Sequence, residues 1–145
     1  MIIDTRYFGE IELDESKLLH FENGLFGFEE YKDYTLLYDS ENGDDPFFSW
    51  LQCTSQCDLA FPVVNPQKVM QDYDPIVEDG LLNDLGEFGE EDMVVLVLAT
   101  VPSDIKKASV NLKAPLIINV STRKGIQLVT ENPEYEIKHY LVEQD

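Results

Sequence analysis

The sequence has few of the features that secreted and membrane proteins need. It contains two cysteines, Cys53 and Cys57, too few for a disulfide scaffold, which favours a reducing cytoplasm. Its longest apolar run, Met93–Ala99, is seven residues long, which excludes a membrane-spanning helix in this sequence. The first residues lack the basic start and apolar stretch of a secretory signal, so we expect a cytoplasmic protein that is not exported by that route.

Basic residues are also scarce. Lys and Arg number 10 against 29 Asp and Glu, for a formal net charge of −19. Residues 33–105 hold sixteen acids and one base, a net charge of −15, whereas residues 1–32 carry −5 and residues 106–145 carry +1. This field repels nucleic acid and anionic membranes and attracts cationic partners over about 8 Å at physiological salt. We therefore expect no direct binding of nucleic acid or membrane, although the charge also serves solubility.

Catalytic and metal-binding motifs are missing as well. There is no G-x-S-x-G elbow, phosphate loop or dinucleotide fingerprint, and Cys53 and Cys57 lack the C-x2-C spacing of a zinc knuckle. His20 and His139 are isolated, as is typical of strand histidines with one hydrogen bond, and the calcium-loop-like stretch that starts at Asp39 lacks key ligands. We expect no cofactor, with two alternatives open: an acidic, carboxylate-based metal-dependent enzyme and a nucleic-acid-mimicking inhibitor.

What the chain does have is strand-forming sequence. At 145 residues with 43% hydrophobic residues, it is long and apolar enough for one domain, which we place at residues 1–145. The expected strands are 2–7, 10–13, 18–21, 34–38, 47–52, 59–64, 93–101, 110–113, 116–119 and 126–129. We predict a mainly β protein: a small β-barrel-like or sandwich fold of many short antiparallel strands with one or two short helices.

Several positions refine this prediction. The first two strands form a hairpin, and Pro62 places its strand at an edge or a bulge. Met93–Val101 is the central strand, and Pro115 bends the 109–120 region. A short helical turn is expected at Gly27–Tyr31, and a second short helix around residues 81–85, within a loop that spans residues 67–92.

Large side chains set among carboxylates suggest a protein-binding surface. Aromatic anchors inside an acidic rim suit a basic, amphipathic partner segment. The alternative is that the rings fold onto the core and the acids form a solvated face. The candidate residues are Asp72, Tyr73, Asp74, Glu78, Asp79 and Phe88.

A second candidate surface is the edge around residues 111–119. The bend at Pro115, with Asn111 before it, is expected to leave backbone groups open to a partner strand or helix end. The alternative is an internal structural bend.

The order of several motifs is specific in combination. Residues 21–29, FENGLFGFE, are similar to the pattern F-x-x-G-L-P-G-F-E, with Phe26 in place of its proline, and residues 61–66, FPVVNP, carry Asn65 where aspartate is frequent. The strongest block is N-L-x-A-P-[IL] at residues 111–116. Further matches are Pro46-Phe47, Trp50–Gln52, Tyr73, Val101-Pro102, Gly125–Gln127 and Tyr135. In this order the chain resembles the flagellar assembly factor FliW family.

The resemblance implies a compact β-barrel-like fold without enzyme activity. It also implies a cytoplasmic chaperone with two protein partners, flagellin and the translational repressor CsrA. Free of flagellin, such a factor captures CsrA and lifts its repression of flagellin mRNA, which couples flagellin synthesis to secretion. We expect the free protein to be a monomer. We also expect the acids of residues 72–92 to disfavour RNA near a bound repressor by like-charge repulsion.

Overall fold

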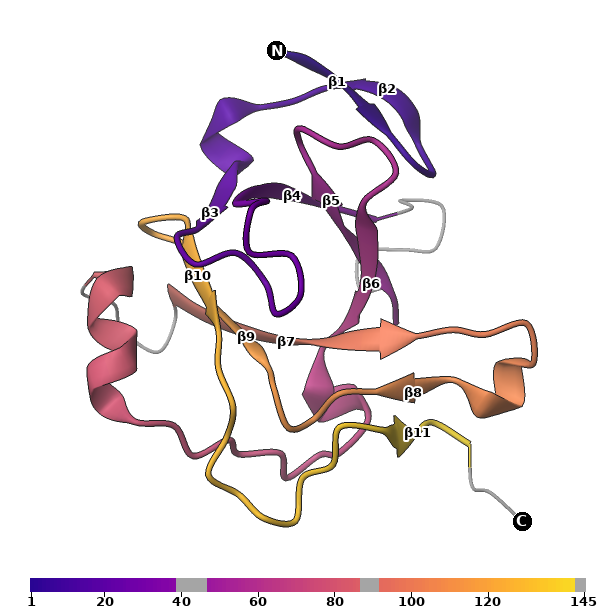
Figure 1. The fold of residues 1–145 in the computed structure, drawn as a ribbon, viewed down its shortest axis with the longest axis vertical. Helices are drawn as coiled ribbons and strands as arrows, with labels where there is room; N and C mark the ends of the chain where they lie inside the picture. The colour runs from indigo at the N-terminus through magenta and orange to yellow at the C-terminus, as the bar shows by residue number, and fades with distance from the viewer. Residues whose placement is uncertain (39–46, 87–91, 143–145) are drawn as a thin grey trace.

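Seven of the strands that the structure describes form a closed ring (Figure 1). The computed structural model describes residues 1–38, 47–86 and 92–142. In ring order the strands are β3 (Leu19–Phe21), β4 (Asp33–Leu37), β5 (Ser49–Cys53), β6 (Ala60–Val64), β7 (Met93–Thr100), β9 (Leu116–Asn119) and β10 (Lys124–Gln127). Neighbours pair antiparallel, and the ring closes through a parallel pairing of β10 with β3. The prediction of a mainly β fold is confirmed, and of its two forms the barrel is the one observed.

The barrel interior is filled by alternate side chains of these strands, since successive residues of a strand point to opposite faces. The interior cluster contains Phe21, Tyr34, Leu51, Val63, Leu96, Leu116 and Ile118, and Leu25 enters it from the turn after β3. β7 is the central strand as predicted, because it pairs with β6 on one side and with β9 and a further strand on the other.

Pro62 lies where β6 has a ladder partner on one side. It stands opposite Trp50 of β5, and the pairing of β6 with β7 begins one residue later, at Val63. The missing N–H of the proline therefore interrupts no pairing with β7, although β6 lies between β5 and β7 and is not an edge strand of the sheet.

The predicted N-terminal hairpin is present and lies outside the ring. β1 (Ile2–Thr5) and β2 (Gly9–Glu12) form a separate two-stranded sheet, and η1 (Glu15–Lys17) leads from it to the barrel. The Arg6 backbone N–H donates to Gln52 Oε1 at 3.0 Å, and the Tyr7 ring lies 4.3 Å from the Trp50 ring, centroid to centroid. These contacts fix the hairpin to the barrel.

On another side, β7 runs past the ring and pairs with β8 (Ser109–Val110), which in turn pairs with β11 (His139–Tyr140). η6 (Ile105–Lys107) joins β7 to β8, and this arm projects from the barrel in Figure 1. No helix among the described residues is long and apolar enough to cross a membrane.

Of the two predicted helical segments, the one near residues 81–85 is present and the one at Gly27–Tyr31 is not. η4 (Asp79–Leu85) is a 3-10 helix at the predicted place, and η3 (Pro66–Lys68) is a second one in the same loop. The helical turn expected at Gly27–Tyr31 is wrong: the chain makes consecutive turns there, with Gly24 and Gly27 at positive φ of 66° and 87°. A right-handed helix needs negative φ, so these glycines favour turns instead.

A second apolar cluster covers the outer face of the barrel. It joins Val97 of β7 to residues of the 64–73 region, the 110–112 region and the C-terminal segment. Its buried members are Val64, Tyr73, Val97, Val110, Leu112 and Tyr135. Residues 64–73 and the C-terminal segment thus pack side by side over β7, and Tyr73 lies against the region of residues 110–112.

Candidate protein-binding surface

Residues 72–78 alternate in exposure along the chain, starting from Asp72 in the turn that the Tyr73 N–H closes on the Met70 carbonyl. Asp72, Asp74, Ile76 and Glu78 are exposed, while Tyr73 is buried and Pro75 and Val77 are half-buried. This alternation is that of a strand with one wet face. It places three of the predicted partner-binding carboxylates, Asp72, Asp74 and Glu78, on one exposed side.

The C-terminal segment holds this backbone in place. Buried Asn132 accepts a hydrogen bond from the Ile76 N–H through Oδ1 at 2.6 Å, and its Nδ2 donates to the Asp74 carbonyl at 3.2 Å. The Asp74 N–H donates to the Tyr135 hydroxyl at 2.8 Å, and the Glu131 N–H donates to the Ile76 carbonyl at 2.7 Å. The two segments are therefore joined by three side-chain hydrogen bonds and one backbone hydrogen bond, without a strand ladder.

This pairing adds carboxylates to the same surface. Glu131 and Glu134 are exposed on the C-terminal segment, and Glu134 lines a hollow of about 470 Å³ together with Asp72, Asp74 and Ile76. We call the five residues Asp72, Asp74, Glu78, Glu131 and Glu134 the acidic strip. With an exposed isoleucine among them, they suit a partner that presents both cations and apolar side chains.

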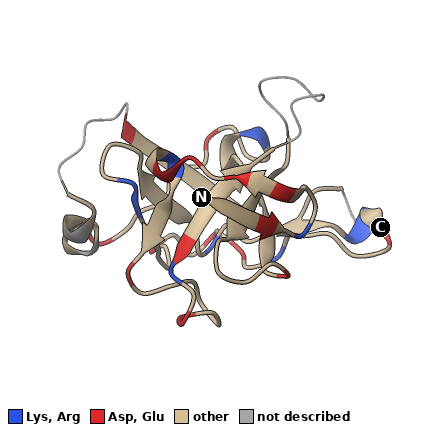
Figure 2. Cartoon of the chain, turned by 90° about the horizontal axis from the view of Figure 1, so that it is seen from above, with Lys and Arg blue, Asp and Glu red and all other residues tan. Residues whose placement is uncertain are grey.

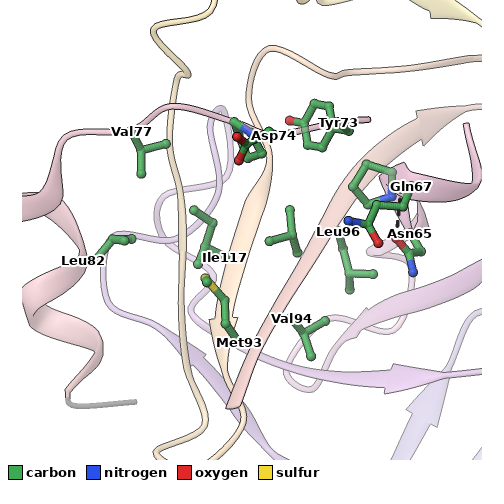
Figure 3. Close-up of a pocket in the computed structure, with 13 residues that line it drawn as sticks. Asn65, Gln67, Tyr73, Asp74, Val77, Leu82, Met93, Val94, Leu96 and Ile117 are labelled. Carbon is green, nitrogen blue, oxygen red and sulfur yellow. Dashed lines mark hydrogen bonds between the residues drawn. The ribbon is translucent and has the colours of Figure 1, made fainter. Parts of the chain in front are cut away.

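An apolar groove lies beside the acidic strip (Figure 3). Its volume is about 470 Å³, and Asp74 lines it as well as the acidic hollow. Figure 3 shows Leu82 on the η4 side pointing toward Met93 and Ile117 of the barrel. Asn65 and Gln67 stand at the other end, joined by a hydrogen bond from the Gln67 N–H to Asn65 Oδ1 at 3.0 Å.

Tyr73 is not available to a partner in this structure. Its side chain is buried, its ring centroid lies 4.6 Å from that of Tyr135, and its hydroxyl donates to the Leu112 carbonyl at 2.7 Å. Burial raises the pKa of the Tyr73 phenol. The prediction that Tyr73 anchors a partner helix is therefore wrong, because the ring anchors residues 72–78, which we call the acidic segment, to the protein itself.

The bend at residues 111–115 is closed in the same way. Asn111 Oδ1 accepts from the backbone N–H groups of Lys113 and Ala114 at 3.1 and 3.0 Å, and Pro115 is buried. The carbonyls of residues 112–115 accept from the Tyr73 hydroxyl, the Thr130 N–H, Gln127 Nε2 and the Leu128 N–H. The prediction of backbone groups open to a partner is wrong, since the chain itself uses them.

Two predicted residues are placed only in part or not at all. The backbone of Asp79 begins η4, and Phe88 lies outside the described residues. Asn132 and Ile76 were missed by the sequence reasoning. No local pattern marks an isoleucine exposed beside a half-buried valine, or an asparagine that binds a segment 56 residues away.

Away from this surface, His20 lies between two carboxylates. Its Nδ1 lies 2.7 Å from Asp33 Oδ1 and its Nε2 lies 2.9 Å from Glu22 Oε2, so it makes two such contacts and not the one expected. The hydrogen bond with Asp33, then that with Glu22, raises the pKa of His20. These contacts join β3 to β4 and to the following turn.

Neither of the two alternative functions, a metal-dependent enzyme and a nucleic-acid mimic, is supported by a site among the residues described. No three His, Cys, Asp or Glu side chains in these ranges are placed to hold a metal ion, and Cys53 and Cys57 are free thiols. The acidic strip surrounds Ile76 and borders an apolar groove, which differs from the regular array of charges on duplex phosphates.

Comparisons with known proteins agree with the fold and with the motifs. The model of the family described as "FliW protein" matches residues 2–141. The flagellar assembly factor FliW of Lachnoclostridium phytofermentans is 48% identical over 143 residues, covering 99% of this chain and 92% of that protein. The factor of the same name from Lachnospira eligens is 45% identical over 140 residues, covering 96% of this chain and 93% of that protein.

A solved structure of a flagellar assembly factor has the same fold. The crystal structure of the flagellar assembly factor FliW superimposes with a TM-score of 0.89 at 32% identity, covering 100% of this chain and 99% of that one. The chain therefore belongs to the FliW family, whose members are flagellar assembly factors and not enzymes.

Proposed function

We propose that this flagellar assembly factor works in the cytoplasm by binding two proteins in exchange. It binds flagellin as a chaperone, and when free of flagellin it captures the translational repressor CsrA and antagonises its binding to RNA. Flagellin synthesis is thereby coupled to flagellin secretion. The observation that carries this proposal is the acidic strip, five exposed carboxylates on a backbone held by Asn132 and Tyr135.

Electrostatics supplies the physical reason. A protein that binds RNA presents a basic surface, because it must neutralise phosphates. The chain carries a net charge of −19, and Figure 2 shows acidic positions on the N-terminal hairpin and around the barrel as well. When the acidic strip docks beside the repressor's RNA site, the whole field disfavours phosphate without any side chain entering that site.

The experiment that tests this proposal compares two charge-reversal variants, one in the acidic strip and one in the N-terminal hairpin. Asp72, Asp74 and Glu78 are changed together to lysine, and a matched variant changes Asp4, Glu10 and Glu12, three exposed acids of the hairpin, in the same way. Dissociation constants for purified CsrA and for flagellin are then measured at low and high salt.

We expect the strip variant to bind CsrA more weakly and with a smaller salt dependence, while the hairpin variant keeps most of the affinity. Equal losses in both variants would show that net charge alone matters. Unchanged binding in the strip variant would place the interface elsewhere, and failure of the unmodified chain to bind either protein would overturn the proposed function.

A further inference from the structure

The groove beside the acidic strip is an exposed apolar hollow. Its apolar lining comes from the acidic segment, η4 and the barrel: Val77, Leu82, Met93, Val95 and Ile117. Met93, the first residue of β7, is 38% exposed, and Val77 and Leu82 are half-buried. Methionine adapts its shape easily, so this lining can close around side chains of different shape.

The groove is large enough for a side chain from another molecule. Its volume of about 470 Å³ exceeds the roughly 150 Å³ of an apolar cavity that accepts benzene. It also lies within the range of about 300–1,000 Å³ that is typical of ligand pockets. A phenylalanine, leucine or methionine side chain therefore fits with room to spare.

The rim decides the charge of the occupant. Asp74 lines both the groove and the acidic hollow, and Asp72, Ile76 and Glu134 share that hollow with it. An anionic segment would meet these carboxylates as it entered, whereas a lysine or arginine next to the inserted side chain would pair with them. A second copy of this chain, at a net charge of −19, brings more repulsion than attraction.

We propose that the groove receives a large apolar side chain from a basic amphipathic segment of a protein partner, with the cations of that segment on the acidic strip. This inference rests on the proposed function for one point, that the partner is a protein, and it adds where on this chain that partner binds. The sequence analysis expected an aromatic side chain of this chain to contact the partner. In this proposal the chain provides the groove, and the partner provides the side chain that enters it.

Model peptides test the groove without any natural partner. The probes are a basic amphipathic helix of leucine and lysine, about 18 residues or five turns long, and the same sequence with glutamate for lysine. A leucine–lysine peptide of shuffled order has no apolar face and reports charge attraction alone. Binding to the full chain is measured by fluorescence anisotropy and mapped by amide chemical shifts.

The variants separate the groove from the strip. Met93→Asp places a charge in the apolar lining, and Met93→Trp fills the groove without adding charge. Ile105→Asp, at a position in η6 that is 69% exposed and is not part of the groove lining, is the matched control. Thermal melts establish that each variant is folded before binding is compared.

We expect the leucine–lysine helix to bind with shifts at Val77, Leu82 and Ile117, and both Met93 variants to weaken it at least about tenfold, a difference of roughly 1.4 kcal/mol. The Ile105 control should bind as the unmodified chain does. Equal binding of the shuffled or glutamate peptide, an unaffected Met93→Asp variant, or a dimer of this chain that Met93→Asp abolishes would each overturn the inference. If CsrA or flagellin still binds and is insensitive to Met93→Asp, the inference fails while the proposed function stands.

Discussion

Asn132 holds the backbone of Ile76, its Oδ1 accepting the Ile76 N–H at 2.6 Å across 56 residues of sequence. The same side chain donates to the Asp74 carbonyl, so one buried amide satisfies two backbone groups of the acidic segment. The exposed carboxylates of Asp74 and Glu78, on either side of Ile76, are thereby held in position before a partner binds. This lowers the conformational entropy that is lost on binding.

Changing Asn132 to alanine should destabilise the protein by about 1–3 kcal/mol, because the Ile76 N–H and the Asp74 carbonyl lose their partner. Chemical denaturation measures the loss, and hydrogen exchange should be faster at Ile76. Asn132→Asp keeps an acceptor for Ile76 but loses the donor, so we expect its exchange at Ile76 to stay slow. Slow exchange at Ile76 in the alanine variant would contradict this account of the segment.

Tyr73→Phe should lower the free energy of unfolding by about 1–3 kcal/mol, since it leaves the buried Leu112 carbonyl without the hydroxyl that donates to it. The ring and its contact with Tyr135 remain. At a temperature where the variant is fully folded, CsrA affinity should be unchanged. A variant of normal stability with weakened binding would restore Tyr73 as a partner contact.

The stability of the fold should depend on pH through His20. Hydrogen bonds with Asp33 and then Glu22 raise its pKa above the ordinary 6.5, so its contribution is fully present below pH 6.5 and is lost as pH rises through the folded pKa. The effect is small because the side chains are 42–77% exposed. Melting temperatures of the protein and of His20→Gln should differ most below pH 6.5 and converge above the folded pKa. Curves that stay parallel across this range would rule out this role.

Gly24 and Gly27 should respond differently to alanine. Both have positive φ, but a Cβ on Gly24 would lie 2.6 Å from the Glu29 Cα, whereas a Cβ on Gly27 would have nothing within 4 Å. Gly27→Ala should cost about 1 kcal/mol from backbone strain alone, and Gly24→Ala should cost clearly more because backbone must move. Equal losses for the two variants in denaturation would show that the close approach at Gly24 is not limiting.

Local pattern was enough to find most strands, because apolar alternation and turn residues act within a few positions. It did not reveal how the ring closes, since the parallel pairing of β10 with β3 joins Lys124 to His20 across most of the chain. Nor did it separate a buried ring from an exposed one: Tyr73 is flanked by exposed Asp72 and Asp74 in sequence, but its own side chain is buried against Tyr135.

The charge distribution along the sequence was informative but incomplete. Residues 106–145 carry a net charge of +1, which suggested a neutral C-terminal third. In the fold, Glu131 and Glu134 join Asp72, Asp74 and Glu78, because Asn132 and Tyr135 bind the acidic segment. The acidic strip therefore contains residues from both 33–105 and 106–145. Counting charges along the sequence could not predict this, because a tertiary contact brings the two regions together.

The most direct test of the central claim is the amount of CsrA bound to flagellin mRNA leader in the presence of this protein, with and without flagellin. We expect the unmodified protein to release CsrA from the RNA, added flagellin to restore RNA binding, and the variant with lysine at Asp72, Asp74 and Glu78 to leave CsrA on the RNA. RNA binding that is unaffected by the unmodified protein, or that stays suppressed when flagellin is added, would contradict the account.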